Sequence, residues 1–261
     1  MTTRSRCWSW SSSGSAKTSE WIDYAHKPYD MLTIPMTDPG YGVSDHYLGE
    51  KGAEYFGWQQ GSGDFGGRIN RHKFAHLIRP SDAVIDFGCG GGFLLKNLTC
   101  RRRLGVEINP VARAAAVNNG IECAETIGEL PDGVADVIVS DHALEHVPFP
   151  IGALRELRSK LRPNGLLAIC VPHGNYMEER RYDPSDLNHH LHSWTVQTLG
   201  NTLIEAGFEI VSIANRTHAW PGRWTVACYG RLPLWLFDRI CTTYGVLTAK
   251  GQQVMAVARP G

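Results

Sequence analysis

Short apolar segments alternate with amphipathic segments along the C-terminal two-thirds of this chain. A short apolar run is typical of a buried strand, whereas apolar residues spaced three and four apart predict a helix. Strands are therefore predicted at 83–87, 103–107, 121–124, 135–140, 166–171, 208–214 and 251–258, and helices at 92–99, 110–118, 151–160 and 195–206. This order predicts an α/β fold with a doubly wound, mostly parallel sheet of seven strands.

The residues before the first predicted strand fall into two parts. Residues 1–19 are rich in serine and contain no acidic residue, which predicts a disordered leader, although a transit peptide has a similar composition. Residues 20–79 are rich in aromatic side chains, and 59–67 contains too much glycine to predict a helix. Residues 80–261 are expected to form the main domain, with an apolar insertion near 218–249.

The most specific motif follows the strand predicted at 83–87. It reads VIDFGCGGG from Val84 to Gly92, which is a strand ending in an acid and then a glycine loop. Glycines let the backbone approach a bulky ligand, so a strand, a glycine loop and a helix start indicate a nucleotide-cofactor pocket. A second acid, Glu107, ends the next predicted strand about 20 residues after Gly88. A carboxylate at this spacing is typical of binding to ribose hydroxyls.

The detail of the loop separates two kinds of cofactor. A dinucleotide fingerprint has the form G-x-G-x-x-G/A, but Phe93 stands at its last position here. The loop instead matches G-x-G-x-G, and Asp86 precedes it, where a carboxylate suits a cationic amino-acid group better than a pyrophosphate. Two further blocks follow, LPDGVADVIVS from Leu130 and LRPNGLLAI from Leu161. With VIDFGCGGG and GVEINP, they resemble the class I S-adenosylmethionine-dependent methyltransferases over about residues 80–215.

The resemblance implies a Rossmann-like methyltransferase sheet whose last strand is antiparallel, with residues 20–79 as a lid. It implies S-adenosylmethionine as the cofactor, with Glu107 on the ribose hydroxyls and the glycines under the amino-acid portion. The cofactor-binding residues that it implies are Asp86, Gly88, Cys89, Gly90, Gly92, Glu107, Ile108, Thr126 and Asp141.

Two histidine-bearing segments follow predicted strands, at the edge of the sheet where ligands bind. The first reads SDHALEHVP from Ser140 and formally contains the H-x-x-E-H pattern of a zinc peptidase. That pattern requires a continuous helix, whereas this segment follows a strand and runs into prolines, so we reject the peptidase. The resemblance instead places His142 beside the methyl donor and gives Glu145 and His146 a supporting role.

The second segment, 182–195, carries three histidines and two aspartates. Relatives often have the pattern H-L-H here, which His190 and His192 match. Because the ordinary pKa of histidine is near neutrality, we predict His142 or His190 as the general base and Asp183 as the carboxylate that orients it. The same side chains could bind a metal, but no spacing is diagnostic, so no metal site is assigned.

Composition narrows the class of partner. Basic and acidic residues number 26 each and 43% of residues are hydrophobic, which is typical of a globular protein and does not favour nucleic acid. No apolar run reaches the about 18 residues of a membrane span. Seven cysteines without a C-x-x-C pair fit reduced thiols in a cytoplasmic protein. The apolar insertion makes a homodimer a further expectation.

Three functions are compatible with these observations. The first is O-methylation of a small-molecule hydroxyl, such as a sugar of a polysaccharide or a glycosylated metabolite, because such a hydroxyl needs a base. The alternative is methylation of a quinone precursor or another phenolic metabolite. A further alternative is a cofactor-binding module without catalysis, against which the intact Asp86, glycine loop and Glu107 argue.

Overall fold

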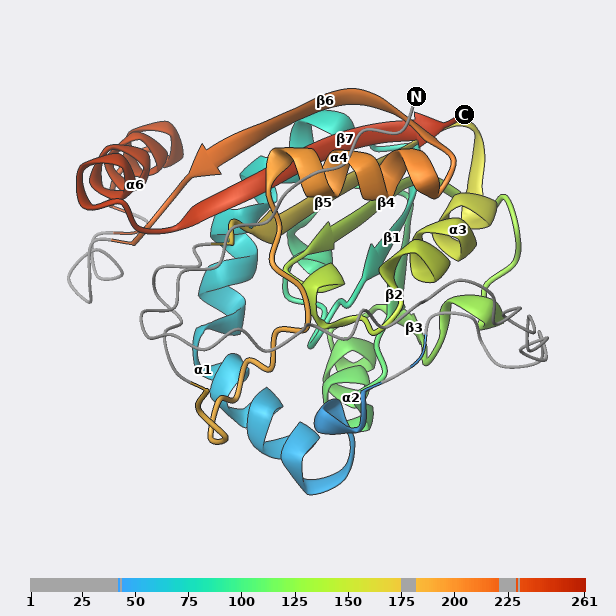
Figure 1. Ribbon diagram of the computed structural model, residues 1–261, viewed down its shortest axis with the longest axis horizontal. Helices are drawn as coiled ribbons and strands as arrows, with labels where there is room; N and C mark the ends of the chain where they lie inside the picture. Colours follow the sequence, from blue (N-terminus) through green and yellow to red (C-terminus); the bar gives the residue numbers. More distant parts are fainter. Residues whose placement is uncertain (1–41, 43, 175–181, 221–228, 230) are drawn as a thin grey trace, which may run out of the picture. The chain divides into compact units, whose positions relative to one another are not determined.

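The computed structural model of the chain describes residues 42, 44–174, 182–220, 229 and 231–261. Over these residues it forms a seven-stranded sheet with the order β3-β2-β1-β4-β5-β7-β6 (Figure 1). The strands are β1 Ala83–Phe87, β2 Arg102–Val106, β3 Glu122–Ala124, β4 Ala135–Asp141, β5 Leu161–Pro172, β6 Phe208–Thr217 and β7 Gln252–Pro260. The predicted fold class is therefore confirmed. The leader expected at 1–19 and the first part of the expected lid, up to residue 41, lie outside the described residues.

The direction of the strands determines where a ligand can bind. Strands β1 to β5 are parallel, and β7 lies antiparallel between β5 and β6. The antiparallel last strand is thus confirmed. The chain order reverses between β1 and β4, and in open α/β sheets the carboxyl ends of the strands at such a switch point form the ligand crevice.

The helices that connect the strands largely match the prediction. They are α1 Gly49–Phe74, α2 Pro110–Asn118, α3 Pro150–Lys160, α4 Val196–Glu205 and α6 Leu234–Thr248. Local signals determine the start of α2, because the Asn109 side chain accepts the N–H groups of Val111 and Ala112 and Pro110 occupies the first turn. In the described part of the chain, no helix combines the length and apolarity that crossing a membrane requires.

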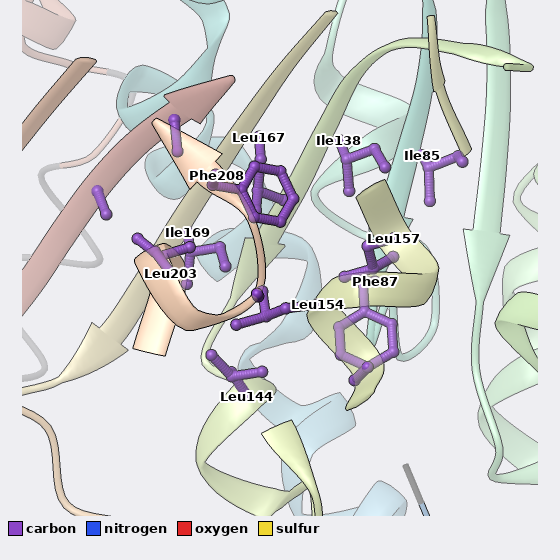
Figure 2. Packing of buried hydrophobic residues seen from close by; sticks show 14 of the residues in the cluster. Ile85, Phe87, Ile138, Leu144, Leu154, Leu157, Leu167, Ile169, Leu203 and Phe208 are labelled. Atoms are coloured by element: carbon purple, nitrogen blue, oxygen red, sulfur yellow. The ribbon is translucent and has the colours of Figure 1, made fainter. Parts of the chain in front are cut away.

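The core lies on both faces of the sheet, because successive residues of a strand point to opposite sides. Ile85 of β1 belongs to the cluster that also contains Leu154 of α3 and Leu203 of α4 (Figure 2). Its neighbour Val84 belongs to the opposite cluster, together with Phe74 at the end of α1. Each such side chain contributes about 1.5–3 kcal/mol when fully buried, so both layers of helices are held on the sheet.

Helix α1 shows that the expectation for 59–67 was wrong. The helix runs through these residues although it contains seven glycines, each of which costs about 1 kcal/mol relative to alanine. A Cβ atom at Gly67 would lie 2.2 Å from the carbonyl oxygen of Phe93, and one at Gly63 would lie 2.3 Å from the Phe93 ring. The glycines therefore let α1 lie against the loop after β1. Burial of side chains such as Ile69, 1% exposed, offsets the low helix propensity.

The prediction of a helix at 92–99 was also wrong. After the glycine loop the chain makes only the short 3-10 helix η3, Leu95–Asn97. Leu95 and Leu98 are buried, so their spacing reflects the packing of a loop on the sheet rather than an α-helix. In the described structure the glycine loop is covered by α1 instead of leading into an α-helix of its own.

The apolar insertion contains α6, although residues 221–228 and 230 lie outside the described part. Phe237 and Cys241 of α6 are buried in a cluster with Ile69 of α1. Trp235 and Leu247 are 65% and 80% exposed. One face of α6 therefore packs on α1, and self-association through the exposed side chains stays a prediction.

Candidate functional site

Glycine shapes the loop after β1. Gly88 has a φ angle of +74°, and a Cβ atom there would lie 2.3 Å from the Cβ of Ala143 after β4. Gly90 has a φ angle of +51°, and its N–H donates to Oε2 of Glu107 at 2.8 Å. Residues with a side chain rarely adopt such angles, so this loop conformation requires glycine. The loop is thereby bound to the residue that follows β2.

Glu107 lies beside a cavity with mostly apolar walls. Its Oε1 atom accepts the N–H of Asn109 at 2.8 Å. Burial raises the pKa of Glu107, while the N–H groups of Asn109 and Gly90 lower it in part. The residues lining this cavity include Phe87, Gly88, Gly90, Val106, Glu107, Ile108, Asn109, Ala112 and Ala143. An apolar cavity with one carboxylate fits a purine nucleoside whose ribose hydroxyls donate to Glu107.

A second cavity lies at the end of β1 and includes Asp86 and Cys89 in its lining. Asp86 is 2% exposed, and burial together with the charges of Asp141 and Glu107 raises its pKa well above the ordinary value. A bound cation would relieve this unfavourable charge, so the cavity fits the ammonium group of an amino-acid portion. The two cavities share Gly88 and Gly90 in their walls, which would let S-adenosylmethionine span both.

Asp141, at the end of β4, is held by helix α1. Its Oδ1 atom accepts a hydrogen bond from Nζ of Lys73 at 2.7 Å, and its Oδ2 atom accepts one from Nδ2 of Asn70 at 2.8 Å. Lys73 is 2% exposed, so the ion pair is buried. Removing one partner of such a pair costs about 3–5 kcal/mol, because the other charge stays buried. The pair fastens α1 across the carboxyl edge of the sheet.

A third cavity, of about 560 Å³, is large enough for a small organic molecule. We name it the acceptor cavity. Its lining residues are Tyr55, Trp58, Gln59, Gly61, Asp141, His142, Glu145, His146, Asn188 and His190. Both predicted histidines, His142 and His190, thus border the same space. His142 also lines the two cofactor cavities, so it lies where the cofactor and an acceptor would meet.

Glu145 forms a buried, negatively charged wall of the acceptor cavity. The residue is 0% exposed, and neither carboxylate oxygen has a hydrogen-bond partner among the described residues. Its Oε1 atom lies 3.5 Å from Nδ1 of His142 and 3.8 Å from Nε2 of His146. A buried carboxylate without hydrogen bonds is costly, so Glu145 is expected to gain a partner when the cavity is filled.

His142 is held in an unusual conformation beside two carboxylates. Its φ angle is +58°, and its N–H donates to the carbonyl of Cys170 at 2.8 Å. Burial lowers the pKa of His142, but the interactions of its ring with the Cys170 side chain and with the Glu145 carboxylate, 3.5 Å away, together with the charge of Asp141, outweigh burial and raise the pKa to about 10. The ring is then a cation at neutral pH. A cation is a poor proton acceptor and a good partner for an anion, which weighs against the base role predicted for His142.

His146 differs from His142 although the two are four residues apart. The hydroxyl of Tyr47 lies 2.6 Å from Nδ1 of His146 and 2.7 Å from the carbonyl oxygen of Asn188. Because a carbonyl only accepts, Tyr47 donates to Asn188 and accepts the proton of Nδ1. Burial lowers the pKa of His146 to about 4, despite the charge of Glu145, so its ring is neutral. Tyr47, in the 3-10 helix η1 (Asp45–Tyr47), thereby joins the N-terminal segment to 182–195.

Two polar residues of 182–195 bond away from the cavity. Asp183 is exposed, and its Oδ1 atom accepts the N–H and the hydroxyl of Ser185 at 2.9 and 2.7 Å. These contacts form a local turn and do not orient His142 or His190. His192 directs Nε2 to the carbonyl of Val147 at 2.9 Å, so it shapes the loop.

Two residues predicted to bind the cofactor, Thr126 and Gly92, lie outside the lining of the three cavities. The N–H and hydroxyl of Thr126 bond to the carboxylate of Glu129, and Thr126 does not line any of the three cavities. Gly92 has a φ angle of +72°, and a Cβ atom there would lie 2.7 Å from Cγ1 of Ile121. Gly92 is thus required for packing against the α2–β3 connection.

Part of the acceptor cavity has the residue types that bind metal ions. The ligand atoms of Glu145, His146 and His190 all lie within 4.8 Å of one another. One carboxylate and two imidazoles could hold a divalent cation. A second group is centred on Asp141, but that carboxylate already pairs with Lys73.

Comparison with known proteins agrees with this geometry. A family model described as a methyltransferase domain matches residues 68–213, which is more than half of the chain. The chain belongs to this methyltransferase family. The resemblance stated from the sequence motifs is confirmed.

Curated relatives carry the name ubiquinone biosynthesis O-methyltransferase. The protein of Nitrosococcus oceani is 34% identical over 105 residues, which cover 34% of this chain and 43% of that protein. The protein of Burkholderia thailandensis is 24% identical over 178 residues, which cover 55% of this chain and 72% of that protein. The match therefore spans less than half of the length of the first of these relatives.

Solved structures share the fold at low sequence identity. An S-adenosylmethionine-dependent methyltransferase from Thermotoga maritima has a TM-score of 0.56 at 16% identity and covers 80% of this chain and 95% of its own. One from Archaeoglobus fulgidus has a TM-score of 0.54 at 17% identity and covers 78% and 98%. At these identities the likeness concerns the fold alone.

Proposed function

We propose that this protein uses S-adenosylmethionine to methylate a phenolic hydroxyl of a small aromatic molecule. The cofactor supplies an activated methyl group, so the protein has to hold the cofactor, align the acceptor and handle one proton. Asp86, Glu107 and the glycine loop would hold the cofactor, and His142 would face the acceptor. This proposal favours the phenolic alternative over the sugar hydroxyl that we expected first from the sequence.

The placement of His142 beside two carboxylates is the observation that carries the proposal: its ring nitrogens lie 4.0 Å from Oδ1 of Asp141 and 3.5 Å from Oε1 of Glu145. A sugar hydroxyl needs a strong base, but the carboxylates beside His142 keep that ring cationic, and the pKa of His146 is about 4. Neither ring suits the removal of a proton from a sugar. A phenol ionises near pH 10, and a neighbouring cation stabilises its phenolate. We assign this task to His142 and the transfer of the proton to His190, which is exposed at the mouth of the cavity.

The walls of the acceptor cavity also support a phenolic acceptor, and so do the names of the relatives. Tyr55 and Trp58 of α1 lie with their ring centroids 6.0 Å apart and border the cavity. Aromatic walls favour a flat ring, which they can contact by stacking or edge-on packing. The curated relatives are named as O-methyltransferases, which supports transfer to an oxygen atom.

The acceptor is tested with the full chain, S-adenosylmethionine and two compounds of similar size, a catechol-type phenol and a hexose. Mass spectrometry of the products should show methylation of the phenol only. Methylation of the hexose only would overturn the phenolic assignment. Cofactor binding by calorimetry without turnover on either compound would instead favour the non-catalytic module.

The role of His142 is tested with His142→Gln and with His76→Gln, an exposed histidine beyond α1, as the control. Loss of a cation that favours ionisation and binding of the phenolate should lower kcat/KM by about 10²-fold. A nitrophenol that is already ionised at neutral pH distinguishes the two roles of His142. If the cation binds the phenolate, His142→Gln raises the KM for this anionic acceptor too. If His142 is the base, the nitrophenol is methylated at the wild-type rate.

A further inference from the structure

A group of polar side chains outside the three cavities joins helix α1, strand β6 and helix α6. His72 lies in the last turn of α1, His218 follows β6, and Asp238 lies near the start of α6. The Nε2 atom of His72 lies 3.1 Å from Oδ1 of Asp238, and the Nε2 atom of His218 lies 3.3 Å from the same oxygen. No step of the proposed reaction uses these residues.

We propose that His72, His218 and Asp238 bind a divalent transition-metal ion of the zinc class, which fastens α6 to α1. Two imidazoles and one carboxylate are ligands that zinc accepts, and water can fill the remaining position. This site lies apart from the Glu145–His146–His190 group of the acceptor cavity. The proposal therefore does not depend on the proposed function.

The spacing of the ligand atoms fits a metal ion. The three ligand atoms all lie within 4.8 Å of one another. In a tetrahedral zinc site the metal–ligand distances are about 2.0–2.2 Å, so neighbouring ligand atoms lie about 3.3 Å apart. The distances of 3.1 and 3.3 Å to Oδ1 of Asp238 agree with this value.

The hydrogen bond of His72 prepares its ring for a metal. The Nδ1 atom lies 2.5 Å from the carbonyl oxygen of Ile69, and since a carbonyl only accepts, Nδ1 carries the proton. The Nε2 atom, on the other side of the ring, faces Oδ1 of Asp238 at 3.1 Å. Metal-binding histidines generally donate their other N–H in this way.

The ring of His218 places a nitrogen without a hydrogen-bond partner among the described residues beside the same carboxylate oxygen of Asp238. The side chain of His218 is 7% exposed, and its Nε2 atom and Oδ1 of Asp238 have no hydrogen-bond partner of acceptable geometry in the described structure. A buried nitrogen and carboxylate oxygen without partners are costly, and a shared metal ion would satisfy both.

The backbone around the group is held rigidly. The N–H of His218 donates to the carbonyl of Gly251 at 2.9 Å, which ties His218 to the residue before β7. Phe237 and Cys241, on either side of Asp238 in the chain, are buried against Ile69. Asp238 itself is 37% exposed in its side chain, which leaves an entry path for an ion. Preorganised ligands with an open side are what metal uptake requires.

The charges near the site permit a dication. Lys73, next to His72, is a cation close enough to act on His218. Its Nζ atom pairs with Asp141 at 2.7 Å, and this pairing compensates the charge. With Asp238 as a ligand, the site filled by a divalent ion has a net charge of about +1.

The experiment uses the full chain after treatment with a chelator. Co²⁺ titration followed by visible absorption, and Zn²⁺ content by elemental analysis, should show a stoichiometric site in the wild type. Asp238→Asn and His72→Gln change partly exposed side chains and should weaken this site by about 100-fold or more. His76→Gln, on an exposed histidine, is the matched control and should keep it. A second control, His146→Gln, changes the Glu145–His146–His190 group, and metal binding at the proposed site should be unaffected by it.

The same proposal has a test without substitutions. Zn²⁺ should protect His72 of the wild type from carbethoxylation, as mapped by mass spectrometry. Absence of stoichiometric metal in the wild type would overturn the proposal. So would full metal binding in both Asp238→Asn and His72→Gln, loss of all metal in His146→Gln alone, or unchanged carbethoxylation of His72 with Zn²⁺.

Discussion

The cofactor side and the acceptor side of this site are built in different ways. On the cofactor side, backbone conformation and backbone N–H groups dominate: Gly88 and Gly90 have positive φ angles, and Gly90 donates to Glu107. These residues directly follow β1 and β2, which are adjacent in the sheet and consecutive along the chain. On the acceptor side, side chains from distant segments meet, such as Tyr47 with His146, 99 residues apart, and with Asn188, 141 residues apart.

The difference determines what each side can tolerate. A backbone-built loop depends on the absence of side chains, so one added methyl group changes its structure. A side-chain network depends on protonation and on hydrogen bonds between elements, so isosteric substitutions change its chemistry and leave the fold intact. We therefore expect substitutions in the glycine loop of the cofactor side to reduce stability strongly. Substitutions on the acceptor side should instead change acceptor binding and its pH dependence.

The largest effect is expected from Gly88→Ala. The residue would have to keep a φ angle of +74° and would place its Cβ atom 2.3 Å from that of Ala143, so we expect a loss of about 2–5 kcal/mol in the free energy of unfolding. The matched control is Gly120→Ala, where φ is +80° but nothing lies within 4 Å, and the loss should be about 1–2 kcal/mol. Urea denaturation measures both. Equal losses would show that the contact with Ala143 is unimportant.

The next effect concerns cofactor affinity. Glu107→Gln keeps the shape of the side chain but places an amide donor against the N–H of Gly90 or Asn109. We expect binding of S-adenosylhomocysteine to weaken by about 1.5–3 kcal/mol, measured by calorimetry. Glu125→Gln is the control, because Glu125 is exposed, pairs with Arg113 and does not line the cofactor cavity. An unchanged affinity in Glu107→Gln would contradict the ribose assignment.

A smaller effect is expected from Tyr47→Phe, because Tyr47 lines the cofactor cavity but contacts His146 in the wall of the acceptor cavity. The substitution removes the hydroxyl that joins His146 to the carbonyl of Asn188. The lost hydrogen bonds should cost about 1–2 kcal/mol of the free energy that holds His146 in place. The KM for the acceptor should rise by about tenfold, with a lesser change in cofactor affinity. Tyr244→Phe, on α6, is the control. A change confined to cofactor affinity would place Tyr47 on the cofactor side of the comparison.

The smallest effects are those of pH on stability. The pKa of His142 is raised to about 10, so its stabilising contribution is fully present below about pH 6.5 and is lost as the pH rises through 10. The side chain is 36% exposed, so solvent screening keeps the contribution modest. The pKa of His146 is lowered to about 4, so stability is lost as the pH falls from about 6.5 toward 4.

Urea unfolding from pH 4 to 10 checks both histidines. Relative to the wild type, His142→Gln should flatten the alkaline decline in stability, and His146→Gln should flatten the acid decline. Parallel curves for all three proteins would show that neither histidine has a shifted pKa.

The sequence predicted the cofactor side far better than the acceptor side. The turn at Gly88, the acid Asp86 and the spacing to Glu107 are local features, because strand, loop and next strand follow one another along the chain. Asp183 illustrates the opposite case: it lies near His190 in the sequence, yet its carboxylate bonds to Ser185 in its own turn. Proximity along the chain did not indicate which side chains face each other.

By itself, then, the sequence determined where the strands lie along the chain and where the glycine loop lies, because apolar periodicity and steric limits act over a few residues. Only the tertiary structure decided that α1 continues through its glycines, because the gain comes from close packing against Phe93. It also decided the charge of His142 and left the buried Glu145 carboxylate without a hydrogen bond among the described residues. A pKa and a hydrogen bond depend on what burial removes from water and on which charges the fold brings near, and neither is a property of the chain alone.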